Sequence, residues 1–148
     1  MTVRIDRCKI IDFPKISDPR GDLTFIEQEK DVPFDIKRVY YIYDVSSGSK
    51  RGGHAHKTSE EVIIPISGSF DVKLDDGFKK VAILLNRPYF GLYIAPWVWR
   101  VIENFSSNSV ALILASTLYN ESDYVRNYKV FKKEVRAKDK LLTIERPK

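Results

Sequence analysis

The sequence predicts an all-β domain in which two facing sheets form a jelly-roll-like barrel. Apolar and polar residues alternate with a period of two from about residue 22 to residue 117. Turn-forming residues interrupt this alternation at short intervals, which gives nine short segments with strand character. Nine strands in so short a stretch are more than one sheet would hold, and a chain of 148 residues has the size of one domain.

Each expected strand is bounded by residues that end or bend a strand. A Ser/Gly loop at 46–49 separates two of them, and the 75–77 sequence Asp-Asp-Gly supplies the positive φ of a tight hairpin. Pro88 and Pro96 withhold hydrogen-bond donors at strand boundaries. The strands are expected at residues 23–27, 36–43, 53–57, 61–67, 69–74, 79–84, 91–94, 99–104 and 110–117.

The N-terminal segment predicts one further strand. Residues 3–13 carry apolar side chains at Val3, Ile5, Ile10, Ile11 and Phe13. A strand at the terminus of a barrel is a natural element to pair with a second subunit.

The C-terminal segment changes character and predicts one helix over residues 123–135. Tyr124, Tyr128 and Phe131 recur at spacings of three and four residues, and Ser122 is available as the N-cap. We therefore expect one domain over residues 1–131, followed by a basic tail over residues 132–148 that holds seven Lys or Arg residues.

Charge and composition exclude several classes of protein. The net charge of +5 comes from 25 basic and 20 acidic residues, and both signs are mixed through residues 1–131. The tail lacks the interleaved aromatic residues of single-strand binders, so a small anionic ligand is expected rather than nucleic acid. No apolar run reaches membrane-spanning length, which predicts a cytoplasmic protein without a membrane partner. Cys8, the single cysteine, excludes an internal disulfide and a zinc ribbon.

The candidate chemistry concentrates in residues 51–56, Arg-Gly-Gly-His-Ala-His, which contain both histidines of the chain. At positions i and i+2 of a strand, His54 and His56 project from the same face. Two imidazoles can therefore converge on one ligand inside the barrel.

The spacing of His54, His56, Glu61 and Gly68 resembles the first signature motif of the cupin superfamily. In metal-binding cupins, such histidines and glutamate hold a divalent metal together with a histidine from a second motif. No histidine follows residue 56 in this chain, and Arg100 lies in the second-motif region. We therefore expect no metal, with Glu61 as the residue that keeps the alternative open.

Most of the chain, from about residue 5 to residue 131, resembles more closely the cupin sugar 3,4-ketoisomerases, which act on dTDP-linked 4-keto-6-deoxyhexoses. One position departs from the pattern, because Glu61 stands where a glutamine is expected in these metal-free enzymes. The resemblance is carried by residues 18–23 (DPRGDL), 36–43 (IKRVYYIY), 51–57 (RGGHAHK), 67–69 (SGS), 75–77 (DDG), 91–94 (GLYI), 99–100 (WR) and 119–128 (YNESDYVRNY).

The resemblance implies an isomerase that turns the C4 ketone of the sugar into an alcohol and the C3 alcohol into a ketone, through an enediol and without a nicotinamide or other cofactor. His54 is expected as the principal base, with His56 as its partner in the proton relay or in orienting the substrate. Tyr40 is expected as the second acid–base group. The resemblance favours it over Tyr41 and Tyr43, since strand parity alone leaves the inward face open. Arg100 is expected to stabilise the enediolate or to aid delivery of the proton at C4.

The nucleotide half of the substrate needs phosphate donors and a platform for the base. Arg20, Arg51 and Lys57 are the candidate donors, and Trp99 is the candidate platform. The resemblance further implies a homodimer with exchanged N-terminal strands, working in amino- or deoxysugar biosynthesis.

Three other functions stay open at this point. A metal-dependent cupin enzyme would use Glu61 as a ligand, and a non-catalytic cupin would bind a nucleotide sugar without turnover. A sugar 3,5-epimerase would also pair a histidine base with a tyrosine acid, but the motifs match the ketoisomerases better.

Overall fold

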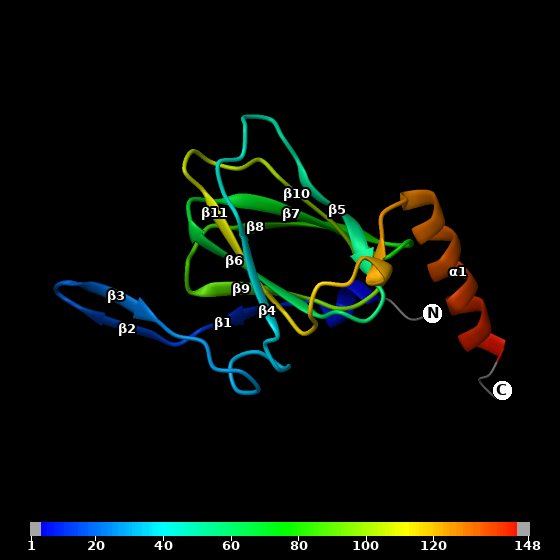
Figure 1. The fold of residues 1–148 in the computed structure, drawn as a ribbon, viewed down its shortest axis with the longest axis horizontal. Helices are drawn as coiled ribbons and strands as arrows, with labels where there is room; N and C mark the ends of the chain where they lie inside the picture. The colour runs from blue at the N-terminus through cyan, green and yellow to red at the C-terminus, as the bar shows by residue number, and fades with distance from the viewer. Residues whose placement is uncertain (1–3, 145–148) are drawn as a thin grey trace.

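Two five-stranded antiparallel sheets face each other in the computed structural model, which describes residues 4–144 (Figure 1). One sheet has the order β1-β9-β6-β11-β4 and the other the order β12-β5-β10-β7-β8. This arrangement confirms the predicted jelly-roll cupin barrel. The strands are β1 (Lys9–Asp12), β4 (Arg38–Ile42), β5 (Arg51–His56), β6 (Glu61–Ser67), β7 (Phe70–Asp75), β8 (Lys80–Leu85), β9 (Phe90–Ile94), β10 (Trp99–Glu103), β11 (Val110–Ala115) and β12 (Tyr124–Val125).

The alternation that predicted the strands also decides which side chains enter the barrel. In β4, Val39 and Tyr41 are more than half exposed, whereas Tyr40 and Ile42 pack against the core. Strand β6 is buried on both faces because Phe13 and the segment with Val32 and Phe34 join the same core cluster. Burial of apolar area inside the barrel is the main source of its stability.

The hairpin between β7 and β8 forms as the Asp-Asp-Gly sequence predicts. Gly77 has a φ of +90°, and its N–H donates to Asp75 Oδ1 at 2.7 Å. Asp76 Oδ1 accepts the N–H groups of Phe78 and Lys79. The two carboxylates therefore hold the turn, and glycine supplies the left-handed backbone that it requires.

The N-terminal prediction is only partly correct. Residues Arg4–Arg7 form a 3-10 helix, η1, and the strand is confined to β1, which pairs with β9 of the same chain. Ile5 explains the break, since its N–H donates to the buried Asp76 carboxylate and its carbonyl accepts the N–H of Cys8. Val3 lies outside the described residues.

A hairpin that the sequence reading missed follows β1. Strands β2 (Lys15–Asp18) and β3 (Gly21–Thr24) pair with each other, where one strand was expected at residues 23–27. The carboxylate of Asp18 accepts the N–H of Arg20 at 2.7 Å, which closes the turn. Figure 1 shows this hairpin projecting away from the barrel.

The C-terminal helix α1 runs over Tyr128–Ile144 and not over residues 123–135. The expected N-cap, Ser122, instead lies in a 3-10 turn, η2 (Glu121–Asp123), which leads into β12. Asn127 precedes α1, and its Oδ1 accepts the N–H of Val130. Asn127 is therefore the cap of this helix.

Helix α1 packs against the outer face of the sheet that contains β5 and β10 (Figure 1). Phe131 and Val135 are fully buried there, beside Ala55 and Val125. The expected division between a domain and a basic tail at residue 131 falls inside this helix. No helix in the described part of the chain is long and apolar enough to cross a membrane.

Candidate active site

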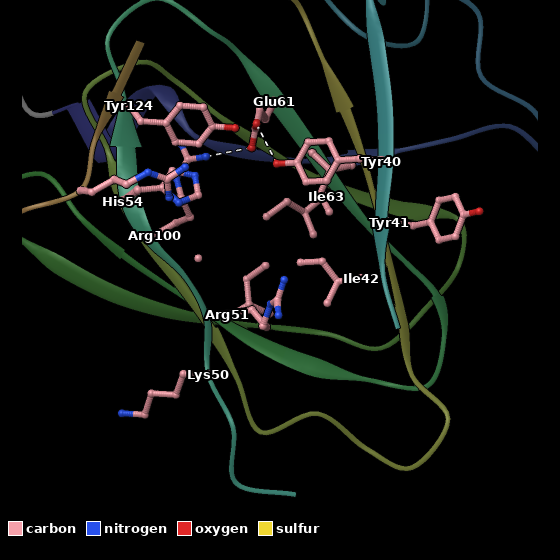
Figure 2. Close-up of a pocket in the computed structure, with 14 residues that line it drawn as sticks. Tyr40, Tyr41, Ile42, Lys50, Arg51, His54, Glu61, Ile63, Arg100 and Tyr124 are labelled. Carbon is pink, nitrogen blue, oxygen red and sulfur yellow. Dashed lines mark hydrogen bonds and ion pairs between the residues drawn. The ribbon is translucent and has the colours of Figure 1, made fainter. Parts of the chain in front are cut away.

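A cavity of about 430 Å³ opens between the two sheets and collects most of the residues that were predicted to be catalytic. Figure 2 shows Tyr40 of β4, His54 of β5 and Arg100 of β10 pointing toward one another, together with Glu61 of β6 and Tyr124 of β12. The cavity is lined by Tyr40, Tyr41, Ile42, Lys50, Arg51, Gly52, His54, Glu61, Ile63, Arg100, Ile102, Ile113, Tyr124 and Arg126.

Two glycines let β5 carry both an arginine and a histidine to this cavity. Gly52 and Gly53 have φ angles of +86° and +70°, and the pairing of β5 with β10 shifts register here. A Cβ at Gly52 would lie 3.0 Å from the carbonyl oxygen of Arg100. The glycine pair is thus a β-bulge inside a strand, and it re-aims the residues on either side of it.

His54 faces the cavity with a free imidazole. Neither of its ring nitrogens has a hydrogen-bond partner among residues 4–144. Burial lowers the pKa of His54 to about 3, with the positive charge of Arg100 and the proximity of His56 as further causes. The ring is therefore neutral near pH 7 and has a lone pair to accept a proton.

Tyr40 enters the cavity because the even positions of β4 face inward. Its Oη donates to Glu61 Oε1 at 2.9 Å, whereas Tyr41 points away from the cavity (Figure 2). Burial, and then the negative charge of Glu61, raise the pKa of Tyr40 far above its usual range. Tyr40 is thus a neutral phenol whose proton is hydrogen-bonded to Glu61.

Glu61 connects the groups around the cavity. Besides Tyr40, it accepts a hydrogen bond at Oε2 from Arg100 Nη1 at 2.8 Å, and Arg38 Nη2 lies 3.9 Å from its Oε1. Burial alone would raise the pKa of Glu61, but its contacts with His56, Arg100 and Tyr40 outweigh burial and hold the pKa below the usual range. The sequence reading singled out Glu61 only as a potential metal ligand.

His56 lies behind the cavity and does not line it. Its Nδ1 is 3.2 Å from Asp123 Oδ2, and its Nε2 is 3.0 Å from Glu61 Oε1. The ring is almost completely buried and meets the His54 ring edge-on, with 4.9 Å between the ring centroids. Within the described residues, no group of three or more His, Cys, Asp or Glu side chains could hold a metal ion.

The four residues that were predicted to bind the nucleotide are separated by the fold. Arg51 lines the cavity, but Arg20 lies on the projecting hairpin, where it pairs with Asp18, and Lys57 is exposed beyond the end of β5. Trp99 points to the outer face, against Tyr128 and Phe131 of α1. Trp99 and Arg100 are consecutive in one strand, so only one of them can face the cavity.

Three cationic or aromatic lining residues were missed by the sequence reading, namely Lys50, Tyr124 and Arg126. The Tyr124 ring contacts both histidine rings, with centroid separations of 4.9 and 4.4 Å. Arg126 lies over the Tyr124 ring and pairs with Glu121. The prediction of a helix over residues 123–135 hid strand β12, which carries Tyr124, and the position of Arg126 directly after that strand.

Comparison with known proteins places the chain among sugar-nucleotide isomerases. Residues 6–136 match the FdtA family, described as WxcM-like, C-terminal. A TDP-4-oxo-6-deoxy-alpha-D-glucose-3,4-oxoisomerase from Aneurinibacillus thermoaerophilus is 49% identical over 127 residues, which cover 86% of this chain and 91% of that protein.

Two solved structures are similar in both sequence and fold. The 3,4-ketoisomerase QdtA from Thermoanaerobacterium thermosaccharolyticum, in complex with TDP, is 44% identical with a TM-score of 0.87, covering 88% of this chain and 96% of that one. The TDP-quinovose 3,4-ketoisomerase WlaRB from Campylobacter jejuni is 48% identical with a TM-score of 0.81, covering 85% and 97%.

Proposed function

The chain belongs to the FdtA (WxcM-like, C-terminal) family, and we propose that its cavity isomerises a TDP-linked 4-keto-6-deoxyhexose to the 3-keto sugar. The protein is a sugar-nucleotide 3,4-ketoisomerase of deoxysugar biosynthesis. The observation that carries its chemistry is the neutral ring of His54, whose nitrogens have no hydrogen-bond partner within residues 4–144 and which shares one cavity with Tyr40 and Arg100. We expect it to act in the cytoplasm, as the sequence predicts.

The reaction moves two protons and needs no external oxidant. His54 takes the proton from C3, and the electron pair of that C–H bond forms the C3–C4 double bond while the C4 oxygen becomes an enediolate. Arg100 has an Nη2 without a hydrogen-bond partner among the described residues, and its charge stabilises the enediolate oxygen. Protonated His54 then returns a proton to C4, and the C3 hydroxyl becomes the ketone as its proton passes to the C4 oxygen.

Tyr40 fits the transfer between the two oxygens. A phenol that is held neutral can accept one proton while it releases its own, so it relays a proton without becoming a phenolate. The raised pKa of Tyr40 opposes the alternative in which a free phenolate acts as a base. His56 lies behind the cavity, where its Nε2 is 3.0 Å from the Glu61 oxygen that accepts the hydrogen bond of Tyr40.

Cationic residues at the cavity favour an anionic nucleotide. Lys50, Arg51 and Arg126 line it together with Arg100. Arginine binds phosphate oxygens in a bidentate manner, and we assign the diphosphate of the substrate to Arg51 and its neighbours. The related QdtA was solved with TDP bound.

We further propose that the protein is a homodimer in which the β2–β3 hairpin is the exchanged segment. The hairpin leaves the barrel and exposes Ile16 and Leu23, which pair directly across it. Strand β4 ends its sheet and offers an unpaired edge. Exchange would carry Arg20 toward the other subunit, which is how this exposed residue could contribute to substrate binding.

The test is turnover by protein that has been treated with a chelator. Incubation with TDP-4-keto-6-deoxyglucose should give a 3-keto sugar, identified by proton NMR, at a rate that added divalent metal does not change. Turnover that requires added metal would favour a metal-dependent cupin enzyme instead. Binding of the sugar nucleotide without any product would favour a non-catalytic binding protein.

A further inference from the structure

Glu61 is a buried carboxylate that contacts two residues of the proposed mechanism. Its side chain is about 1% exposed. Tyr40 Oη donates to its Oε1 at 2.9 Å, and Arg100 Nη1 donates to its Oε2 at 2.8 Å (Figure 2). Each carboxylate oxygen therefore binds one of the two groups that were assigned to the sugar oxygens, and Glu61 fixes Tyr40 and Arg100 relative to each other.

We propose that Glu61 is a positioning residue that makes Tyr40 a hydrogen-bond acceptor and Arg100 a donor toward the cavity, so that the sugar binds with its C3 hydroxyl at Tyr40 and its C4 ketone at Arg100. The inference rests on the proposed function and adds the orientation of the sugar to it. Tyrosine alone would not define that orientation, because its hydroxyl can donate as well as accept.

The hydroxyl of Tyr40 has one hydrogen, and Glu61 accepts it. Two guanidinium groups face the carboxylate, Arg100 at 2.8 Å and Arg38 at 3.9 Å, and both favour its ionised form. An ionised carboxylate only accepts hydrogen bonds, so the phenol must be the donor in this pair. The lone pairs of Tyr40 Oη are left for the cavity, where they can accept a hydrogen bond from a sugar hydroxyl.

The guanidinium of Arg100 is held at two of its three nitrogens. Its Nε donates to the carbonyl of Val98 at 3.3 Å, and its Nη1 donates to Glu61. Because the group is planar and rigid, these two bonds also fix Nη2, which has no hydrogen-bond partner within residues 4–144. Guanidinium nitrogens only donate, so Nη2 is suited to a ketone oxygen.

The 4-keto substrate matches this arrangement, and the 3-keto product does not. In the substrate, the C3 hydroxyl has a hydrogen for Tyr40, and the C4 oxygen can accept from Arg100. In the product, the C3 ketone oxygen meets the lone pairs of Tyr40, so two acceptors face each other without a hydrogen between them. The product should therefore bind more weakly than the substrate, which favours its release.

Affinities measured without turnover test this orientation. The 3-keto sugar nucleotide is prepared with the unmodified protein, and the variant His54→Asn, which lacks the base, is titrated with each sugar by calorimetry. We expect TDP-4-keto-6-deoxyglucose to bind roughly 3- to 10-fold more tightly than the 3-keto sugar, the effect of one hydrogen bond. Equal affinities, or tighter binding of the 3-keto sugar, would overturn the proposal.

Adding Glu61→Gln to His54→Asn reverses the arrangement at Tyr40. Since Arg100 only donates, the amide oxygen stays with Arg100 and the amide N–H groups face Tyr40, which frees the phenol hydrogen for the cavity. The 3-keto sugar should then bind at least as tightly as the 4-keto sugar. An unchanged preference for the 4-keto sugar contradicts the proposal.

Glu60→Gln, in the same His54→Asn protein, is the matched control. Glu60 accepts the hydroxyl of Tyr93 at 2.5 Å and is not among the residues that line the cavity, so the substitution removes the same charge from a carboxylate–tyrosine pair elsewhere. The preference for the 4-keto sugar should persist. Its loss in Glu60→Gln as well would show that the effect does not come from the cavity and would refute the role of Glu61.

Kinetics separate positioning from a merely structural role. With His54 present, Glu61→Gln should lower kcat by roughly 10²-fold, because Tyr40 and Arg100 are no longer held for the sugar oxygens. The KM for the 4-keto sugar should change by less than about threefold, since a hydroxyl at C3 can also accept from Tyr40. A large rise in KM with an unchanged kcat would contradict the assignment.

The inference and the proposed function fail in different ways. If the unmodified protein makes no 3-keto sugar, the proposed function fails and the orientation fails with it. If the sugar turns over but the 3-keto product binds as tightly as the substrate, only the role of Glu61 fails. Should Glu61→Gln not fold, the comparison of the two sugars with His54→Asn still decides.

Discussion

The two histidines at and behind the cavity have the same side chain but different surroundings. His54 and His56 are two positions apart on one face of β5. In the described part of the chain the nitrogens of His54 have no hydrogen-bond partner, whereas those of His56 lie 3.2 Å from Asp123 and 3.0 Å from Glu61. Strand parity predicted that both would face the same way. It could not predict Asp123, because its distance to His56 depends on a contact across 67 positions of sequence.

Replacing His54 tests the assigned base. His54→Asn keeps a polar side chain of similar size and removes the proton acceptor, so kcat should fall by roughly 10²- to 10⁴-fold, the usual contribution of a general base. Circular dichroism and the melting temperature should show a folded protein. A variant with near-normal kcat would contradict the role of His54.

Tyr40→Phe removes the hydroxyl that lies between Glu61 and the substrate space. We expect kcat to fall by roughly 10²-fold, since proton transfer between the sugar oxygens loses its relay. The matched control is Tyr43→Phe, which changes an exposed tyrosine directly after the same strand and should leave kcat unchanged. Equal effects of the two substitutions would refute the assignment.

The lowered pKa of His54 predicts how stability changes with pH. In the unfolded chain His54 takes up a proton below about pH 6.5, whereas in the folded protein it does so only near pH 3. The unfolded state binds more protons in this window, so His54 makes the fold less stable as pH falls through it. His54→Asn lacks this effect. As the pH falls from 7 to 4.5, the melting temperature of the variant should therefore rise relative to that of the unmodified protein. A constant difference would argue against the neutral buried ring.

At the scale of elements, local signals predicted the strands well and the helix poorly. The Asp-Asp-Gly turn and the alternation in β4 to β11 depend on neighbouring residues, and both were read correctly. The start of α1 was wrong because Tyr124 and Val125 pair with β5, which is an interaction that helical spacing does not reveal. The β2–β3 hairpin was missed because both of its strands are largely exposed and carry little apolar pattern.

The buried face of helix α1 should hold the helix against the barrel. Phe131 is fully buried against Trp99, so Phe131→Ala should lower the free energy of unfolding by about 3–5 kcal/mol. Leu141 lies on the same helix but is exposed, and Leu141→Ala should change it by less than about 0.5 kcal/mol. Urea denaturation measures both, and similar values would mean that the helix is not docked as described.

The whole molecule raises the question of how many subunits build the site. The sequence indicated that Arg20 would bind substrate, yet in one chain Arg20 is far from the cavity on a projecting hairpin. The proposed exchange of that hairpin between subunits would bring Arg20 to the other subunit. The sequence predicts the exchanged strand within residues 3–13, but β1 in that segment pairs with β9 of the same chain.

Sedimentation equilibrium tests the exchanged hairpin. The unmodified protein should have about twice the 17.2 kDa mass of the chain, and Ile16→Asp should lower it toward one chain by placing a charge on the apolar face of the hairpin. Ile144→Asp, at the exposed end of α1, is the control and should keep the larger mass. A monomeric unmodified protein would contradict the exchange.

The central claim is that one neutral histidine takes the proton from C3 of the sugar and, after its ring proton has exchanged with solvent, delivers a proton to C4. It is tested most directly by incubating TDP-4-keto-6-deoxyglucose with the protein in D₂O and locating deuterium in the product by NMR. The account predicts a 3-keto sugar with deuterium at C4, and neither ketone migration nor deuterium with His54→Asn. Deuterium at C3 and C5 in a sugar that keeps its C4 ketone would contradict it and identify an epimerase.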